Sequence, residues 1–312
     1  MMKNLRIVLG SLVVLMLLSV GPVFALGQPN VNLGFTSFLD GAPPAGPGLY
    51  LSEYLQYYTA DQINDDSGDK IDPFKGVDVW VLMNQLIYQS DQPVLFGGKW
   101  GLNVMLPIVS IDADVLPDSG NGLGDLLIGP YIQWDPIMGA NGPLMVNRIE
   151  LQTIFPTGEY DSDNLLNAGS NHYSFNPYWA ATVFLGPKAT VSWRLHYLWN
   201  GKNDDFSFGG LMPSDVDLEP GDAVHANFAA AYEVLPKQLR LGINGYWFDQ
   251  ITDTKVDGVK DPSLSEKVFA IGPGAVWHFS QDTHLFVNAY FETDAESRPE
   301  GERYNLRLVH HF

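Results

Sequence analysis

The chain has 312 residues, a formal net charge of −19 at neutral pH and no cysteine. So large an acidic excess repels nucleic acid, and the lack of cysteine excludes a disulfide framework and thiol catalysis. Charged residues make up only 17% of the chain, whereas aromatic residues make up 12% and glycines number 31. This balance favours strands with large side chains joined by tight turns.

Residues 1–25 predict a secretory signal peptide. Lys3 and Arg6 form a positive start, the stretch 7–20 is mainly apolar, and small residues precede a cleavage point after Ala25. An uncleaved membrane anchor is the alternative, but the apolar run is short for one. No later apolar run is long enough for a membrane-spanning helix, which excludes a helical inner-membrane protein.

Residues 26–47 are rich in glycine and proline and show no periodicity. Two interpretations remain open for this stretch. It is either a loose leader or a short plug tucked into the interior of the fold that follows.

From Gly48 to Phe312 the chain reads as one domain of strand-like segments. Each segment is at least as long as a tilted strand needs to be to cross a bilayer. We expect twelve strands, at about residues 48–59, 76–89, 95–110, 124–134, 144–157, 172–185, 189–199, 222–232, 238–248, 267–279, 283–292 and 304–312.

The connections between these segments alternate between long and short. The long ones are expected at 60–75, 111–123, 158–171, 200–221, 249–266 and 293–303. The short ones are expected at 90–94, 135–143, 186–188, 233–237 and 280–282. Outer-membrane barrels have this pattern, with long extracellular loops and short periplasmic turns. The sequence therefore predicts an all-β, antiparallel transmembrane barrel of about twelve strands in the outer membrane of a Gram-negative bacterium.

Side chains alternate between an apolar and a polar face along several segments, as in the stretch 189–199. In a membrane barrel the apolar face meets lipid and the polar face meets the lumen. Glu53 interrupts the apolar face of the first segment, so the facing there stays undetermined. The lumen and transport candidates are Arg148, Glu150, Gln152, Arg194, His196, Asn227, Arg240, Asn244, Tyr246, Asn288 and Arg307.

Four arginines stand out among these candidates, namely Arg148, Arg194, Arg240 and Arg307. Their positions along the segments predict one common level in the periplasmic half of the lumen, with Glu150 close enough to pair with a neighbour. Two roles remain open, a structural ion-pair network or a constriction that selects solute.

The final segment ends on an aromatic residue after a regular alternation. Tyr304, Leu306, Leu308 and Phe312 share one face. This ending resembles that of outer-membrane barrels, whose C-terminal strand is recognised by the barrel-assembly machinery. We therefore interpret these four residues as an assembly signal.

Four stretches, taken in order, resemble the outer-membrane family named for the meta-pathway of phenol degradation, also called the SphA-like family. They are Gly122-Leu-Gly-Asp-Leu-Leu-Ile-Gly-Pro-Tyr131, Phe155-Pro-Thr-Gly-Glu-Tyr-Asp161, Asn167-Ala-Gly-Ser-Asn-His-Tyr-Ser-Phe175 and Gly242-Ile-Asn-Gly-Tyr-Trp-Phe-Asp-Gln-Ile-Thr-Asp253. The resemblance covers most of the chain after about residue 48. It implies an outer-membrane barrel associated with aromatic catabolism that passes hydrophobic substrates.

No enzyme motif appears in the sequence, and Ser192 and His196 lie too far apart along one strand to hydrogen-bond directly. We expect no catalytic residue, no cofactor and no metal site, although the acidic loops leave divalent-ion binding open. The expected partners are outer-membrane lipid and lipopolysaccharide, the barrel-assembly machinery and the solute. The expected function is passive passage of small hydrophobic or aromatic compounds. The alternatives are a structural or adhesive barrel with a plugged lumen and, least favoured, a barrel enzyme.

Overall fold

The structure is a computed structural model that describes residues 31–312 except 42, 44–45, 73, 114–119 and 208–215. The expected signal peptide and residues 26–30 lie outside the described residues. Within the described part of the chain, no helix is both long enough and apolar enough to span a membrane.

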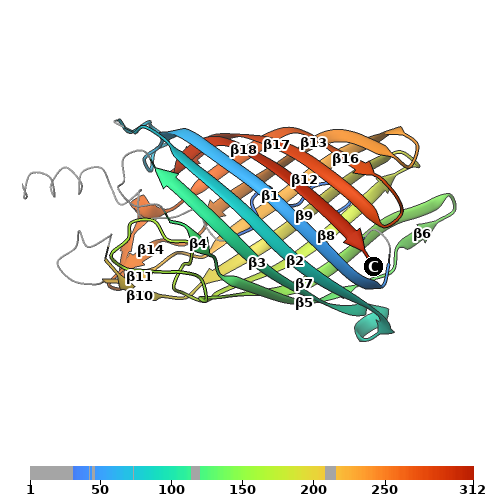
Figure 1. Cartoon of the computed structure of the whole chain (residues 1–312), viewed down its shortest axis with the longest axis horizontal. Helices are drawn as coiled ribbons and strands as arrows, with labels where there is room; N and C mark the ends of the chain where they lie inside the picture. Colours follow the sequence, from blue (N-terminus) through green and yellow to red (C-terminus); the bar gives the residue numbers. More distant parts are fainter. Residues whose placement is uncertain (1–30, 42, 44–45, 73, 114–119, 208–215) are drawn as a thin grey trace, which may run out of the picture.

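Twelve long antiparallel strands close into a barrel, which confirms the expected fold (Figure 1). Closure joins the first strand to the last, because Tyr54 of β1 lies opposite both Met83 of β2 and Arg307 of β18. A closed sheet has no unpaired edge in the bilayer, where an unpaired backbone group is costly. The barrel strands are β1 Gly48–Ile63, β2 Val77–Pro93, β3 Lys99–Ala113, β5 Leu126–Gln133, β7 Gly142–Phe155, β8 Ser174–Leu185, β9 Ala189–Asn200, β12 Ala223–Leu235, β13 Leu239–Gln250, β16 Lys267–His278, β17 Thr283–Glu296 and β18 Pro299–His311.

The two ends of the barrel differ. The periplasmic end holds the C-terminus, the 3-10 turn η2 Leu95–Gly97 and the short strand β6 Ile137–Gly139, which pairs with β7 (Figure 1). The extracellular end carries longer loops, the short strand β4 Gly122–Leu123 and the 3-10 turn η3 Pro262–Leu264. Four short loop strands form a separate small sheet there, in the order β10 Asn203–Phe206, β11 Val216–Glu219, β14 Thr254–Val256 and β15 Val259–Asp261.

One expected loop is absent among the described residues. The polar stretch 293–303 suggested a long connection, but β17 runs to Glu296 and β18 begins at Pro299. The turn between them is held by Arg298, whose guanidinium lies 3.2 Å from a Glu266 oxygen and 3.4 Å from a Glu292 oxygen. Buried ion pairs therefore keep this polar stretch in regular hairpin geometry rather than in an open loop.

The faces of the strands alternate as predicted. Leu195, Leu241 and Val287 are exposed on the outside, whereas Arg194, Asn244 and Asn288 are buried on the inside. The same parity places Glu53 on the outer face of β1, where it is half-buried opposite Asn84 and Leu308. The inward residues of β1 are therefore the even-numbered ones, which resolves the facing that the sequence left undetermined.

Candidate functional site

The inner surface of the barrel has two chemically different sides. On β7 to β18 the inward side chains are mainly amides, hydroxyls, imidazoles and guanidinium groups, which we call the polar wall. On β1 to β5 most are apolar, although Gln56, Gln85 and Asn103 interrupt them. We call these apolar side chains the apolar wall, which comprises Tyr54, Tyr58, Val79, Val81, Met83, Met105, Val109, Ile111 and Leu127.

The apolar wall was missed in the sequence analysis. Along β2, Val79 and Val81 face inward while Trp80 and Leu82 face the membrane. With apolar residues on both faces, the period-two contrast that marks a polar lumen disappears. The signal that could have revealed this wall is an apolar strand without alternation, which is typical of a strand with apolar surroundings on both sides.

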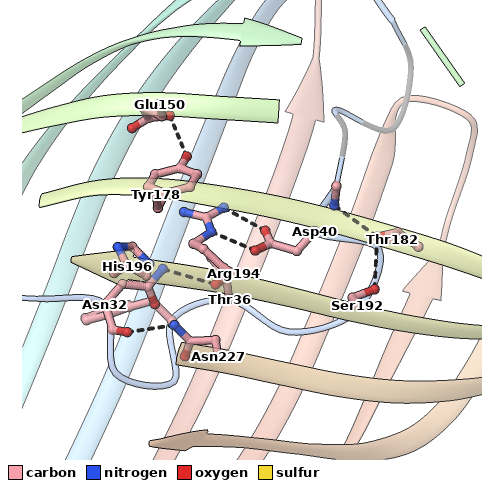
Figure 2. Close-up of polar contacts among 12 residues, drawn as sticks. Asn32, Thr36, Asp40, Glu150, Tyr178, Thr182, Ser192, Arg194, His196 and Asn227 are labelled. Atoms are coloured by element: carbon pink, nitrogen blue, oxygen red, sulfur yellow. Dashed lines mark hydrogen bonds and ion pairs between the residues drawn. The ribbon is translucent and has the colours of Figure 1, made fainter. Parts of the chain in front are cut away.

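A stretch of chain with bends and a turn lies inside the barrel before β1, and we call its residues 31–41 the inner segment. The polar wall binds its backbone (Figure 2). The Asn227 side chain donates to the Asn32 carbonyl at 2.7 Å and accepts from the Gly34 amide at 2.8 Å. The Ser192 hydroxyl oxygen accepts from the Leu39 amide at 3.0 Å. Buried polar side chains of the wall thus find hydrogen-bond partners in the backbone of the inner segment.

An ion pair in the lumen also joins the polar wall to the inner segment. Arg194 of β9 makes two hydrogen bonds of 2.7 Å to the carboxylate of Asp40, and both side chains are 5% exposed. The guanidinium also lies 4.2 Å from the ring centre of Tyr178, whose hydroxyl donates to Glu150 (Figure 2). A two-point arginine–carboxylate contact fixes geometry as well as charge, so it sets the position of the inner segment.

Apolar side chains of the inner segment complete its packing. Val31 and Leu33 lie in a buried cluster with Tyr246 and Tyr290 near the extracellular end. Phe35 packs edge-on against Tyr54 with ring centres 5.7 Å apart, at the margin of the apolar wall. The inner segment therefore binds the polar wall through its backbone and reaches the apolar wall through only part of its surface.

Three cavities follow one another along the lumen. An extracellular vestibule of about 150 Å³ shares Val31, Ile111 and Asn167 with a middle cavity of about 100 Å³. The apolar wall lines the middle cavity. A periplasmic cavity of about 680 Å³ shares Tyr54, Gln85 and Arg194 with the middle one. The cavities thus mark a route beside the inner segment. The middle cavity meets the periplasmic cavity at Tyr54 and Arg194.

Three of the four stretches that carry the family resemblance shape the vestibule, namely 122–131, 155–161 and 167–175. The Asp125 carboxylate accepts from the backbone amides of Gly158 and Ser170, both at 2.9 Å, and from the Ser170 hydroxyl. Gly158 and Gly169 touch so closely that a Cβ on Gly158 would lie 2.7 Å from the Gly169 Cα. The motifs therefore clamp two loops together at the mouth. Burial in the same mouth lowers the pKa of His172.

All eleven lumen candidates face the interior, but in different surroundings. Arg194, Asn227 and Asn288 bind the inner segment. His196 stacks on His225 with ring centres 4.0 Å apart, and Arg307 lies 3.8 Å from the Phe286 ring centre. Further contacts are those of Arg148 with the Tyr131 and Tyr178 rings, Gln152 with Asn176, Asn244 with Ala289 and Tyr246 with Glu292.

One detail of the arginine prediction is wrong. Arg240 pairs with Glu233 at 3.1 Å and donates to the Lys188 carbonyl in a turn, so it lies at the periplasmic rim. The four arginines therefore do not share one level. Glu150 accepts hydrogen bonds from the Tyr178 hydroxyl and the Asn103 amide of neighbouring strands.

An additional buried arginine on the inner face was not foreseen. Arg303 of β18 lies 4.5 Å from the Tyr58 ring centre and donates to Gln56 at 2.6 Å. It escaped notice because the stretch 293–303 read as a loop. Extending the alternation of the last strand by one residue before Tyr304 would have placed Arg303 on the inner face.

The exposed residues of the last strand lie on the outer face. Tyr304, Leu306 and Leu308 are exposed there, and the Phe312 amide donates to the Leu49 carbonyl at 3.0 Å. Their role in assembly stays a prediction.

Comparison with a solved structure of a TM-score above 0.5 agrees with this architecture. An outer membrane channel from Pseudomonas putida F1 is similar over 91% of this chain and 100% of its own, with 21% identity and a TM-score of 0.75. The translocator domain of the autotransporter NalP from Neisseria meningitidis has a TM-score of 0.47, with 8% identity over 86% of this chain and 89% of its own. The β domain of the Bordetella autotransporter BrkA also has a TM-score of 0.47, with 11% identity over 85% of this chain and 100% of its own. No curated protein matches the chain. The family described as "Putative MetA-pathway of phenol degradation" matches residues 60–308, and the chain belongs to that family.

Proposed function

We propose that this barrel is a passive outer-membrane channel for small hydrophobic or aromatic compounds, associated with the degradation of aromatic compounds such as phenol. The observation that carries the proposal is the apolar wall, which lines the lumen between the extracellular vestibule and the periplasmic cavity. The family match and the likeness to an outer membrane channel support it.

The apolar side of the middle cavity suits an apolar ring better than a sugar or an ion. Val81, Met105 and Val109 on that side offer no hydrogen-bonding partner beyond a weak thioether acceptor, whereas amide side chains and the guanidinium groups of Arg194 and Arg303 line the other side. An apolar solute leaves water favourably, whereas a polar one would lose hydrogen bonds against the apolar wall. The cavity, about 100 Å³, is of the same order as the dry cavity of about 150 Å³ that binds benzene in an engineered protein.

The inner segment narrows the lumen in this proposal, and residues 26–47 form a plug unit before the barrel domain 48–312. Its contacts to the polar wall occupy the groups that would otherwise attract water-soluble solutes. The same contacts also favour a second candidate function, a structural or adhesive barrel with a closed lumen. The two functions differ in whether solute passes the apolar wall.

The remaining parts of the proposal concern location and chemistry. We also propose cleavage after Ala25, assembly by the barrel machinery through Phe312 and contact with lipopolysaccharide, and the sequence pattern and the membrane-type barrel fold support these proposals. We propose no catalytic role, because the Ser192 hydroxyl binds Leu39 and Thr182 while His196 binds Asn176.

The test is uptake of a small aromatic compound by cells that carry parental or substituted protein. Val81→Asn places an amide on the apolar wall, and we expect a several-fold slower uptake. Val146→Asn is the matched control, because Val146 lines the wide periplasmic cavity. Equal uptake in both variants and the parent, each shown to be folded, would refute the proposed route.

Deletion of residues 28–47 completes the test, since swelling of protein-containing liposomes in a small sugar should increase if the inner segment narrows the lumen.

A further inference from the structure

The wall of the barrel has a weak seam between β16 and β17. Their described pairing stops at Ile271 opposite Phe291 and resumes at Gly274 opposite Asn288. Pro273 lies in the gap, opposite Ala289, and proline has no N–H to donate to the neighbouring strand. Separating the two strands at this point therefore breaks fewer backbone hydrogen bonds than separating them where the pairing is uninterrupted.

Two other prolines interrupt the pairing in the same way, which provides an internal comparison. Pro130 lies in a gap between β5 and β7, and Pro177 lies in a gap between β8 and β9. By register, exposed Leu151 stands opposite Pro130 and exposed Tyr197 opposite Pro177 on the membrane face. The residue opposite Pro273 is the small Ala289, so this gap has no large side chain over it from the partner strand.

A groove of about 540 Å³ lies on the membrane face at this seam. Large apolar side chains form the margin of the groove, namely Leu55, Leu241, Val287 and Leu306. Small residues also line the groove, namely Pro273, Gly274, Ala275 and Ala289. The inward-pointing Asn288 and Asn305 also line the groove. From Pro273 to Ala275 and at Ala289, the wall therefore carries no large side chain on its outer face.

The inner segment closes the seam from the lumen side. The Asn244 side chain donates to the Ala289 carbonyl at 3.0 Å and accepts from Asn288 at 2.9 Å, and the Ser37 hydroxyl donates to Asn288 at 3.2 Å. The Phe38 ring is 1% exposed, and a Cβ on Gly274 would lie 2.8 Å from it. Gly274 thus touches Phe38 on one side and lines the groove on the other.

We infer that the seam at Pro273 is a lateral opening through which an apolar solute passes between the lumen and the membrane, with Ser37 and Phe38 closing it. The inference rests on the proposed channel function. Phe38 packs in a cluster with Phe286 and Val309, which line the periplasmic cavity. Displacement of the Phe38 ring would therefore join that cavity to the groove. The free energy of an apolar solute falls when it leaves water for the bilayer, so no further driving force is needed.

The experiment uses the absence of native cysteine, which makes any introduced thiol unique. Ala289→Cys reports on the groove, Val109→Cys reports on the apolar wall, and Leu195→Cys reports on membrane-exposed surface far from the seam. Intact cells are treated with N-phenylmaleimide, a small apolar aromatic thiol reagent, and heat-dependent gel migration confirms that each variant is folded. Reaction at Leu195→Cys measures the reagent that arrives through the bilayer itself.

We expect Phe38→Ala to raise the rate at Ala289→Cys several-fold and Pro273→Val, which restores an N–H, to lower it. The matched control Pro177→Val, opposite Tyr197, should leave the rate unchanged. The lateral opening is refuted, and an axial channel stands, if Val109→Cys reacts while neither Phe38→Ala nor Pro273→Val changes the reaction rate at Ala289→Cys. If Val109→Cys does not react at all, the channel proposal fails, and this inference fails with it.

Discussion

The apolar wall and the polar wall are parts of one barrel with a common lipid-facing exterior, yet their side chains have different contacts in the lumen. The polar wall binds a segment of the same chain, for example through Asn227 and Arg194. The apolar wall contacts that segment less and lines the narrow middle cavity instead. The comparison teaches that polar residues in a barrel lumen need not contact solute, because their hydrogen bonds can be satisfied internally.

The largest expected effect comes from breaking the ion pair that joins the inner segment to the polar wall. Asp40→Ala leaves the buried Arg194 guanidinium without its carboxylate, which typically costs about 3–5 kcal/mol. We expect the inner segment to loosen and the conductance in planar bilayers to rise. Adding Arg194→Met should recover part of the lost stability, because the unpaired charge is removed. Parental stability and conductance in Asp40→Ala would show that the pair does not hold the segment.

A charge on the outer face should cost nearly as much. Leu195→Arg places a guanidinium on the membrane face of β9, at an expected cost of roughly 2–4 kcal/mol. Gel migration of unboiled samples measures the folded fraction.

The inward neighbour Ser192 gives the contrasting case. Its buried hydroxyl contacts Leu39 and Thr182, so Ser192→Arg should be tolerated better once residues 28–47 are deleted. Equal damage from Ser192→Arg with and without the deletion would contradict the placement of the inner segment against β9.

The sequence predicted the architecture well because strand period, loop alternation and closure are local or repetitive signals. Leu195 and Arg194 were placed on the correct faces for this reason. The Asp40–Arg194 pair was not predictable, since it joins residues from different parts of the chain through a segment with no periodicity. The apolar wall was missed because alternation indicates a lumen only where the lumen is polar, as the strand around Val81 shows.

A smaller, graded effect should separate the two walls. Val109→Thr keeps the size of the side chain but adds a hydroxyl, which costs about 1–3 kcal/mol if it finds no partner in the cavity. We expect slower uptake of a small aromatic compound. Val146→Thr in the wide periplasmic cavity is the control, and equal slowing in both variants would indicate a general packing effect.

The smallest expected effect concerns the extracellular mouth. Burial raises the pKa of Glu266 from 4.5 to about 7, against the opposing effect of Arg298. Between these two pH values the folded protein holds a proton that the unfolded chain releases, so stability falls as pH rises through this window and levels off above it. Amide hydrogen exchange near Glu266, corrected for intrinsic rates, should therefore accelerate from pH 5 to 7.5. Glu266→Gln should remove this trend, and a persistent trend in that variant would assign it to another group.

The most direct test of solute passage along the apolar wall is a crystal structure of the protein soaked with a brominated benzene. Anomalous scattering locates the bromine independently of the protein atoms. We predict bromine in the middle cavity, against the inner face of β2 and β3 and in contact with Val81, Met105 or Val109. Bromine found solely against the polar wall or on the outer face of the barrel would contradict the proposed route.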